Sequence, residues 1–233
     1  MRYSTKLPYP FVAGGDELKK LFDLLRNHMG NVTISADCAD DKSRPFETIK
    51  ELLTYENPKG KEIRRIVFTA QSDDYSKHGK IDLCSTPRPG ILIDYTGRED
   101  VVTRLETQTL DIIAGIRPWY GVMHRINFQY VFWIVYVIFL LVLLTVAHYN
   151  WAYVSSLKYV VPGPFELWFF LLPGIFFGLG LALDRFRDSL FPRAVFRIGQ
   201  GESRFKHLER VQWGILIAFL ASLAASVVVA AMT

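Results

Sequence analysis

The chain offers few residues whose types and spacing suit catalysis, metal binding or phosphate binding. Asp37, Asp40 and Asp41 lie close together, but no glutamate completes the spacing of a calcium-binding loop. The stretch GQGESR, residues 199–204, lacks the Gly-Lys-Ser/Thr of a phosphate-binding loop. The histidines show no metal-ligand spacing with Cys or Glu, and no nucleophile, base and orienting group form a set. We therefore expect no catalytic residue, no cofactor and no metal site.

The segment GGDEL, residues 14–18, needs separate treatment because it is similar to the GGDEF signature of diguanylate cyclases. In that family the signature lies on a hairpin turn deep in the domain, after a long βα region that builds the nucleotide site. Here 13 residues precede it and a helical apolar spacing follows. We interpret the segment as a helix start, with Asp16 and Glu17 near the positive end of the helix dipole. This interpretation favours a protein that is not an enzyme.

The distribution of charge argues against a nucleic-acid partner. Residues 1–123 carry 18 Lys/Arg and 18 Asp/Glu, so the net charge of +4 comes from the 9 basic and 5 acidic residues that follow. A nucleic-acid-binding domain would carry a basic patch in its folded part. Seven of those nine basic residues instead lie between positions 184 and 210.

Three apolar runs in the second half of the chain indicate membrane spans. They contain no charged residue over 130–147, 167–183 and 214–232. A helix that crosses the hydrocarbon core needs about 20 mostly apolar residues, with a range of roughly 17 to 25. We expect an all-α three-helix transmembrane bundle within a membrane domain over 124–233, with spans at about 129–148, 166–183 and 213–232. The span cores hold no Asp, Glu, Lys, Arg or His, which argues against ion-coupled transport.

The basic residues between the spans predict the orientation. The loop 149–166 has Lys158 as its one basic residue, whereas the loop 184–212 has seven. Because loops that stay in the cytoplasm carry an excess of Lys and Arg, we expect the N-terminus and the loop 184–212 inside and the C-terminus outside. The expected location is a plasma membrane, the inner membrane of a bacterium.

Two sets of residues are predicted at the membrane surface. Trp119, Tyr120 and Trp213 fall near span ends, where aromatic side chains favour the headgroup level. Basic residues of the cytoplasmic loop suit an anionic inner leaflet: Arg185, Arg187, Arg193 and Arg197. The apolar spacing over 184–198 favours an amphipathic helix on that leaflet. The alternative is a short strand that begins after Pro192.

Small residues predict close helix packing in the second and third spans. Gly174 and Gly178 form a small-xxx-small pair, and Ala218, Ser222 and Ser226 recur at steps of four. Such faces serve packing within one bundle or between subunits. We expect a homo-oligomer that uses them.

The first half reads as a soluble domain, residues 1–123. Apolar spacing predicts helices at 16–29, 44–55 and 98–116, and strands at 32–38, 62–70, 81–85 and 90–96. This order favours an α+β domain with a small, mostly antiparallel sheet. Cys38 and Cys84 are expected to be small buried residues in a reducing compartment.

The layout resembles that of uncharacterised bacterial membrane proteins that join an N-terminal soluble α+β domain to three C-terminal transmembrane helices. The stretches that carry the resemblance are FETIKELLTYENPKGKEIRRIVFTA (46–70) and FPRAVFRIGQGESR (191–204). The resemblance implies no activity. The plan is also similar to that of membrane-acting effectors of bacterial defence systems, as an analogy of architecture.

The expected function is that of a non-enzymatic sensor or effector in a membrane. The cytosolic domain would bind a ligand or a partner protein, and the segment 117–125 would couple it to the three-helix bundle. Two alternatives stay open at this point. One is a passive anchor or assembly factor, and the other is a membrane-bound enzyme with an unrecognised site.

Overall fold

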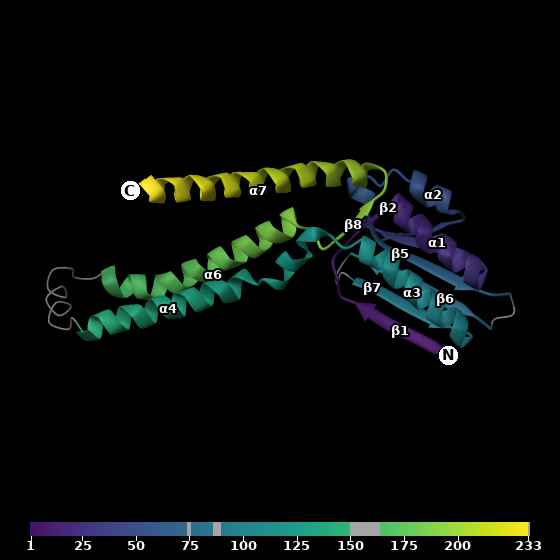
Figure 1. The fold of residues 1–233 in the computed structure, drawn as a ribbon, viewed down its shortest axis with the longest axis horizontal. Coiled ribbons are helices and arrows are strands. Elements are labelled where there is room, and N and C mark those ends of the chain that lie inside the picture. The colour runs from purple at the N-terminus through teal and green to yellow at the C-terminus, as the bar shows by residue number, and fades with distance from the viewer. Residues whose placement is uncertain (74–75, 86–89, 150–163, 233) are drawn as a thin grey trace. The chain divides into compact units, whose positions relative to one another are not determined.

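The computed structural model describes residues 1–73, 76–85, 90–149 and 164–232 (Figure 1). The chain divides into two compact units, Met1–Gly121 with Pro192–Thr233 and Val122–Phe191. This division differs from the expected boundary at residue 123, because the residues from Pro192 onward belong with the N-terminal unit.

The first unit combines a sheet with helices. Its strands are β1 (Arg2–Leu7), β2 (Phe11–Gly14), β3 (Asn31–Cys38), β4 (Ser43–Phe46), β5 (Ile63–Gln71), β6 (His78–Cys84), β7 (Gly90–Thr96) and β8 (Ala194–Arg197). Its helices are α1 (Gly15–Met29), α2 (Ile49–Thr54), α3 (Glu99–Gly115), α7 (Gln200–Met232) and the short 3₁₀ helix η1 (Lys59–Lys61). The 3₁₀ helix η2 (Trp119–Arg125) leads into the second unit, which contains α4 (Phe128–Tyr149) and α6 (Pro164–Leu190).

The main sheet has six strands in the order β1-β7-β6-β5-β3-β4, and every neighbouring pair is antiparallel. Helices α1 and α3 contact each other and lie over one face of it (Figure 1). Residues of that face, such as the cross-strand partners Phe68 and Ile81, are buried in the core. The opposite face is polar, as in the pair of Arg65 with Asp82 at 2.5 Å. The expected α+β class and mostly antiparallel sheet are confirmed.

Helix α1 follows directly from the apolar spacing of its sequence. Leu18, Leu21, Leu25 and Met29 are buried on one side of the helix. Gly30, with a φ of +96°, ends it, because this conformation is costly for residues with a Cβ. The helix expected at 16–29 is confirmed.

The second unit is a hairpin of α4 and α6. Phe176 of α6 contacts the rings of Phe132 and Tyr136 of α4, with centroids 6.1 and 5.7 Å away. The helices come close together at Gly180, where an added Cβ would lie 3.0 Å from the Cα of Gln129. A larger residue at Gly180 would therefore push against the backbone of α4.

The helix α7 has 33 residues, which corresponds to a length of about 50 Å. Among the described residues, its part Gln200–Val227 is the one helix that is long and apolar enough to cross a membrane. A second candidate is found only when Trp119–Arg125 and Phe128–Val142 are counted together as a broken span. The spans at 129–148 and 166–183 thus stay predictions. Most of the expected outside loop 149–166 lies beyond the described residues.

The amphipathic helix expected over 184–198 is wrong. Helix α6 continues to Leu190, and after Pro192 the chain forms β8. Proline disfavours helix at the residue before it, so the helical pattern is broken there. Beyond the break, the apolar residues Phe196 and Ile198 alternate with Arg197 and are buried in the core of the first unit. The alternative of a short strand is the correct one.

Candidate functional site: the joint between the α+β unit and α7

The strand pair β2–β8 ties the start of the chain to the segment before α7. The two strands are parallel and pair over four residues, beginning with Phe11 opposite Ala194. The Phe11 N–H also donates to the Arg193 carbonyl at 2.9 Å. The rings of Phe11 and Phe196 meet edge-on, with centroids 5.5 Å apart. Strand β8 is therefore built into the interior of the α+β unit.

The side chain of Asn57 links this strand pair to the turn after α2. Asn57 is 0% exposed. Its amide donates to the Ile198 carbonyl at 3.3 Å, and its Oδ1 accepts the N–H of Ile63 at 2.8 Å. The backbone carbonyl of Asn57 accepts from the guanidinium of Arg204 at 3.1 Å. Because a buried polar group without a partner is costly, Asn57 makes the positions of β5, β8 and α7 interdependent.

Two glycines let the connection from β8 to α7 pass close to the rest of the unit. Gly199 has a φ of +50°, and an added Cβ would lie 2.5 Å from the carbonyl oxygens of Tyr55 and Glu56. A Cβ on Gly201 would overlap a carbonyl of β8. The Gln200 N–H donates to the Glu56 carbonyl at 2.8 Å, which needs this close approach. Glycine at these two positions is thus a requirement of packing.

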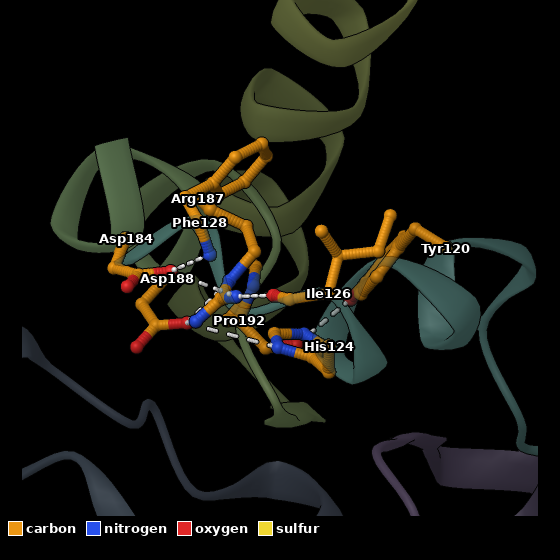
Figure 2. Close-up of polar contacts among 8 residues, drawn as sticks. All are labelled: Tyr120, His124, Ile126, Phe128, Asp184, Arg187, Asp188 and Pro192. Atoms are coloured by element: carbon orange, nitrogen blue, oxygen red, sulfur yellow. Dashed lines mark hydrogen bonds and ion pairs between the residues drawn. The ribbon is translucent and has the colours of Figure 1, made fainter. Parts of the chain in front are cut away.

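The exit from α3 is bonded to the same region. The Val12 N–H donates to the Ile116 carbonyl at 2.8 Å, and the Tyr120 hydroxyl donates to the Pro192 carbonyl at 3.1 Å (Figure 2). Burial raises the pKa of the Tyr120 phenol well above its ordinary value, so the group stays a hydrogen-bond donor. We call the residues 11–14, 56–57, 116–120 and 192–204 together the joint.

Trp119, which belongs to the joint, stacks on Trp213 of α7. Their ring centroids are 5.9 Å apart, with an angle of 30° between the planes. Trp119 is 50% exposed and Trp213 is 49% exposed. Half-exposed indoles of this kind suit the headgroup level that the sequence predicts for both. Tyr120, predicted at the same level, lies instead in the interior of the unit.

The arginines predicted at the membrane surface occupy different environments. Arg185 and Arg193 are exposed. Arg197 lies on β8, with its guanidinium 5.3 Å from the ring centre of Phe205 and 3.8 Å from the Glu202 carboxylate. Because Arg197 lies on β8, which pairs with β2, it is part of the joint.

Arg187 is buried within the second unit, in an ion cluster shown in Figure 2. Its guanidinium lies 3.0 Å from both Asp184 and Asp188, and it donates to the Ile126 carbonyl. Asp184 also accepts the N–H of Phe128, the first residue of α4, at 3.2 Å. The cluster therefore satisfies backbone groups at the start of α4 from the end of α6.

The small residues predicted for helix packing are exposed. An added Cβ on Gly174 or Gly178 would meet no atom within 4 Å. Ala218, Ser222 and Ser226 are exposed on α7, where the Ser226 hydroxyl donates to the Ser222 carbonyl at 2.9 Å. These faces are accessible to another helix, whereas Gly180 performs the close packing within the hairpin.

A surface cavity of about 370 Å³ lies where α1 begins, next to the joint. It is lined by Gly14, Gly15, Asp16, Glu17, Leu53, Arg197, Ile198, Gly199 and Glu202. The Glu17 carboxylate accepts the Gly14 N–H at 3.2 Å, so it caps the helix. Residues 15–17 form the first turn of α1, as the sequence predicts.

Replacing Asp16 with Asn and Glu17 with Gln should leave the protein folded and inserted. Their contribution is an interaction with the helix start, so we expect a loss of about 1 kcal/mol or less in unfolding free energy. Chemical unfolding of the double variant beside the wild type measures it. A variant that folds normally but loses a nucleotide turnover present in the wild type would support an enzyme instead.

Sequence analysis expected coupling through the segment 117–125 but missed three residues that make the joint, namely Asn57, Gly199 and Gly201. Asn57 belongs to no pattern that sequence analysis recognised, and residues 199–204 were considered only as a phosphate-binding loop. The sequence did hold one indication of the joint. Gly199 and Gly201 lie close together at the start of a helix, directly after a segment in which apolar and polar residues alternate. Their partners, however, lie more than a hundred residues earlier in the chain.

The described contacts of the joint are hydrogen bonds and packing contacts, which hold the start of α7 against the α+β unit. Among the described residues, no group of three or more His, Cys, Asp or Glu side chains is arranged to hold a metal ion. No protein-family model matches the sequence, and neither the curated proteins nor the solved structures include a match.

Proposed function

We propose that the chain is a non-enzymatic integral membrane protein that passes the state of a cytosolic α+β domain to a three-helix membrane bundle. The domain would bind a ligand or a partner protein. The observation that carries the proposal is the joint: β8 ends at Arg197 and α7 begins at Gln200. The connection between them is fixed by Asn57 and Gly199. Because this connection is short and held in place, a displacement of the domain would move the start of α7 directly.

The bonding of the joint also supports the number of spans. Residues 193–204 are hydrogen-bonded into the α+β unit, so the start of α7 lies on the same side of the membrane as that unit. The segment 122–191 leaves this side and returns to it, which requires an even number of crossings. With 22 and 27 residues, α4 and α6 reach lengths of about 33 and 40 Å, enough for a core of about 30 Å. One crossing by α7 then makes three.

A reporter of sidedness tests this topology. A reporter fused after Thr233 should be active outside the cytoplasm, and one inserted near Gly201 should be active inside, because the loop 184–212 holds the basic residues. A reporter after Gly121 serves as the control, since it must agree with the one near Gly201. The reversed pattern, or disagreement between those two, contradicts the topology.

Distance measurements between two spin labels test the coupling itself. Lys50 on α2 and Ile217 on α7 are exposed and belong to the same unit. In the membrane-embedded protein we expect one narrow distance distribution. Inserting Gly-Ser-Gly-Ser after His207 should broaden it, whereas four alanines at the same place should keep it narrow because the helix continues. A broad distribution in the wild type would favour a passive anchor.

The exposed small residues of α7 support assembly into a homo-oligomer. Close packing of membrane helices depends on small side chains, so we expect Ser222→Leu to weaken an oligomer captured by crosslinking in membranes. Ala224→Leu is the matched control, because it adds similar bulk on the opposite side of α7. Equal crosslinking of both variants, or a wild type that stays monomeric, contradicts this assembly.

A further inference from the structure

The ion cluster at the base of the α4–α6 hairpin includes a histidine. His124 of η2 has a side chain that is 8% exposed, and its Nδ1 lies 3.7 Å from Oδ1 of Asp188 (Figure 2). The same Asp188 oxygen accepts from two guanidinium nitrogens of Arg187, at 3.1 and 3.0 Å. His124 and Arg187 therefore share one carboxylate.

The formal charges of the cluster do not cancel when His124 is neutral. Asp184 and Asp188 contribute two negative charges and Arg187 one positive charge, so the sum is −1. Arg187 and His124 are both nearly inaccessible to water, with side chains 8% exposed, while Asp188 is 46% exposed. A proton on His124 brings the sum to zero. Among the side chains, imidazole has the unperturbed pKa that lies closest to neutral pH.

Among the described residues of 122–191, charged groups near His124 lie on α6 and on its own element. From α6 they are Asp188 at 3.7 Å, with Arg187 and Asp184 behind it. From its own element it has Arg125 as the next residue, which is exposed. A contact from α4 to this cluster is made by an uncharged group, the Phe128 ring, whose centre lies 5.9 Å from the Arg187 guanidinium. The nearest of these charges to the imidazole is a carboxylate.

We propose that His124 is a proton-binding site that tightens the base of the α4–α6 hairpin as the pH falls. The protonated imidazole completes the neutralisation of the cluster and adds a charged contact to Asp188. Asp188 in turn keeps Arg187 on the Ile126 carbonyl, and Asp184 keeps the Phe128 N–H bonded. The stabilisation is present at mildly acidic pH and is lost as the pH rises through the titration of His124.

Hydrogen exchange of the Phe128 amide reports the closure directly, because this N–H is held by Asp184 and not by an earlier turn of α4. The full chain in lipid nanodiscs is measured at pH 6 and pH 8, with the intrinsic exchange rates divided out. For the wild type we expect protection to fall by about fivefold between pH 6 and pH 8, the scale of a partly exposed ion pair.

Three variants distinguish a proton on His124 from a general effect of pH. His124→Gln should remove the pH dependence. His207→Gln is the control and should keep the dependence, because His207 is exposed on α7. Asp188→Asn should also remove the dependence although His124 is present, because the cluster then sums to zero without a proton. A flat wild-type profile overturns the proposal even if a variant fails to insert. So does a dependence that persists in His124→Gln.

Discussion

Gly199→Ala is expected to destabilise the α+β unit by about 3 kcal/mol or more. The new Cβ would lie 2.5 Å from the carbonyl oxygens of Tyr55 and Glu56, and alanine disfavours the φ of +50°. Backbone atoms cannot move aside as the end of a flexible side chain can. The connection to α7 must therefore shift, which breaks the bond from Gln200 to Glu56 and removes Ile198 from the amide of Asn57.

The measurement is chemical unfolding of the full chain in mild detergent, followed by the near-ultraviolet signal of the buried aromatic residues. Gly60→Ala is the matched control, because a Cβ there meets no atom within 4 Å and Gly60 has no positive φ. We expect the control to unfold within about 0.5 kcal/mol of the wild type. Similar unfolding free energies for the two variants would show that the joint is not packed as described.

Arg187→Met is expected to destabilise the base of the α4–α6 hairpin by about 3 kcal/mol. Methionine has similar length but no charge, so Asp184 and Asp188 would face each other without a cation and the Ile126 carbonyl would lose its donor. The exposure of Asp188 to water moderates the repulsion, which places the effect at the lower end for a broken buried ion pair.

Hydrogen exchange of the first turn of α4, in the membrane-embedded protein, measures this loss. Arg185→Met is the matched control, since Arg185 is a near neighbour on α6 but is exposed. It should change exchange little, as is usual for surface charges. Adding Asp184→Asn to Arg187→Met should recover part of the stability, because it removes one of the two unpaired carboxylates. Equal effects of both single variants would contradict a role for the buried cluster.

The elements that the sequence predicts well are those with a long apolar period. The helices at 15–29 and 99–115 each bury one complete side, and Gly30 ends the first of them. The strand at 31–38 alternates over its whole length. In such segments the pattern and the tertiary packing agree, so the sequence alone locates the element. The expected helix at 44–55 is shorter in the structure, because residues 43–46 pair with β3 as an edge strand.

The strands that sequence analysis missed are short or depend on distant partners. β2 has four residues, too few for a period to be recognised, and β8, also of four residues, was expected only as the alternative to a helix. The two strands pair with each other in parallel. β1 alternates Tyr3, Thr5 and Leu7 against polar residues, but its burial is only partial at the edge of the sheet. Tertiary pairing, rather than local propensity, forms these strands.

The site was less predictable than the fold for the same reason. The exposed indoles of Trp119 and Trp213 lie near the ends of predicted spans, where sequence position alone suggests a role. Arg187 was indistinguishable from its exposed neighbour Arg185 in the sequence, because its two carboxylate partners become meaningful only when α6 packs against α4. Asn57 is a turn residue until Ile198, 141 residues later, becomes its partner.

The insertion of the hairpin 122–191 into the α+β unit has a consequence for the order of synthesis. When the ribosome has made the first 121 residues, β2 has no strand partner and the amide of Asn57 lacks Ile198. Chains emerge at about 5–20 residues per second, and folding of a typical N-terminal domain begins before later segments appear. Here the core is incomplete until Phe196 and Ile198 have been made, and both follow α4 and α6 in the chain. Completion of the α+β unit thus reports that the hairpin has been made. In the topology that we propose, it also reports that the hairpin has returned to the side of the membrane where translation began.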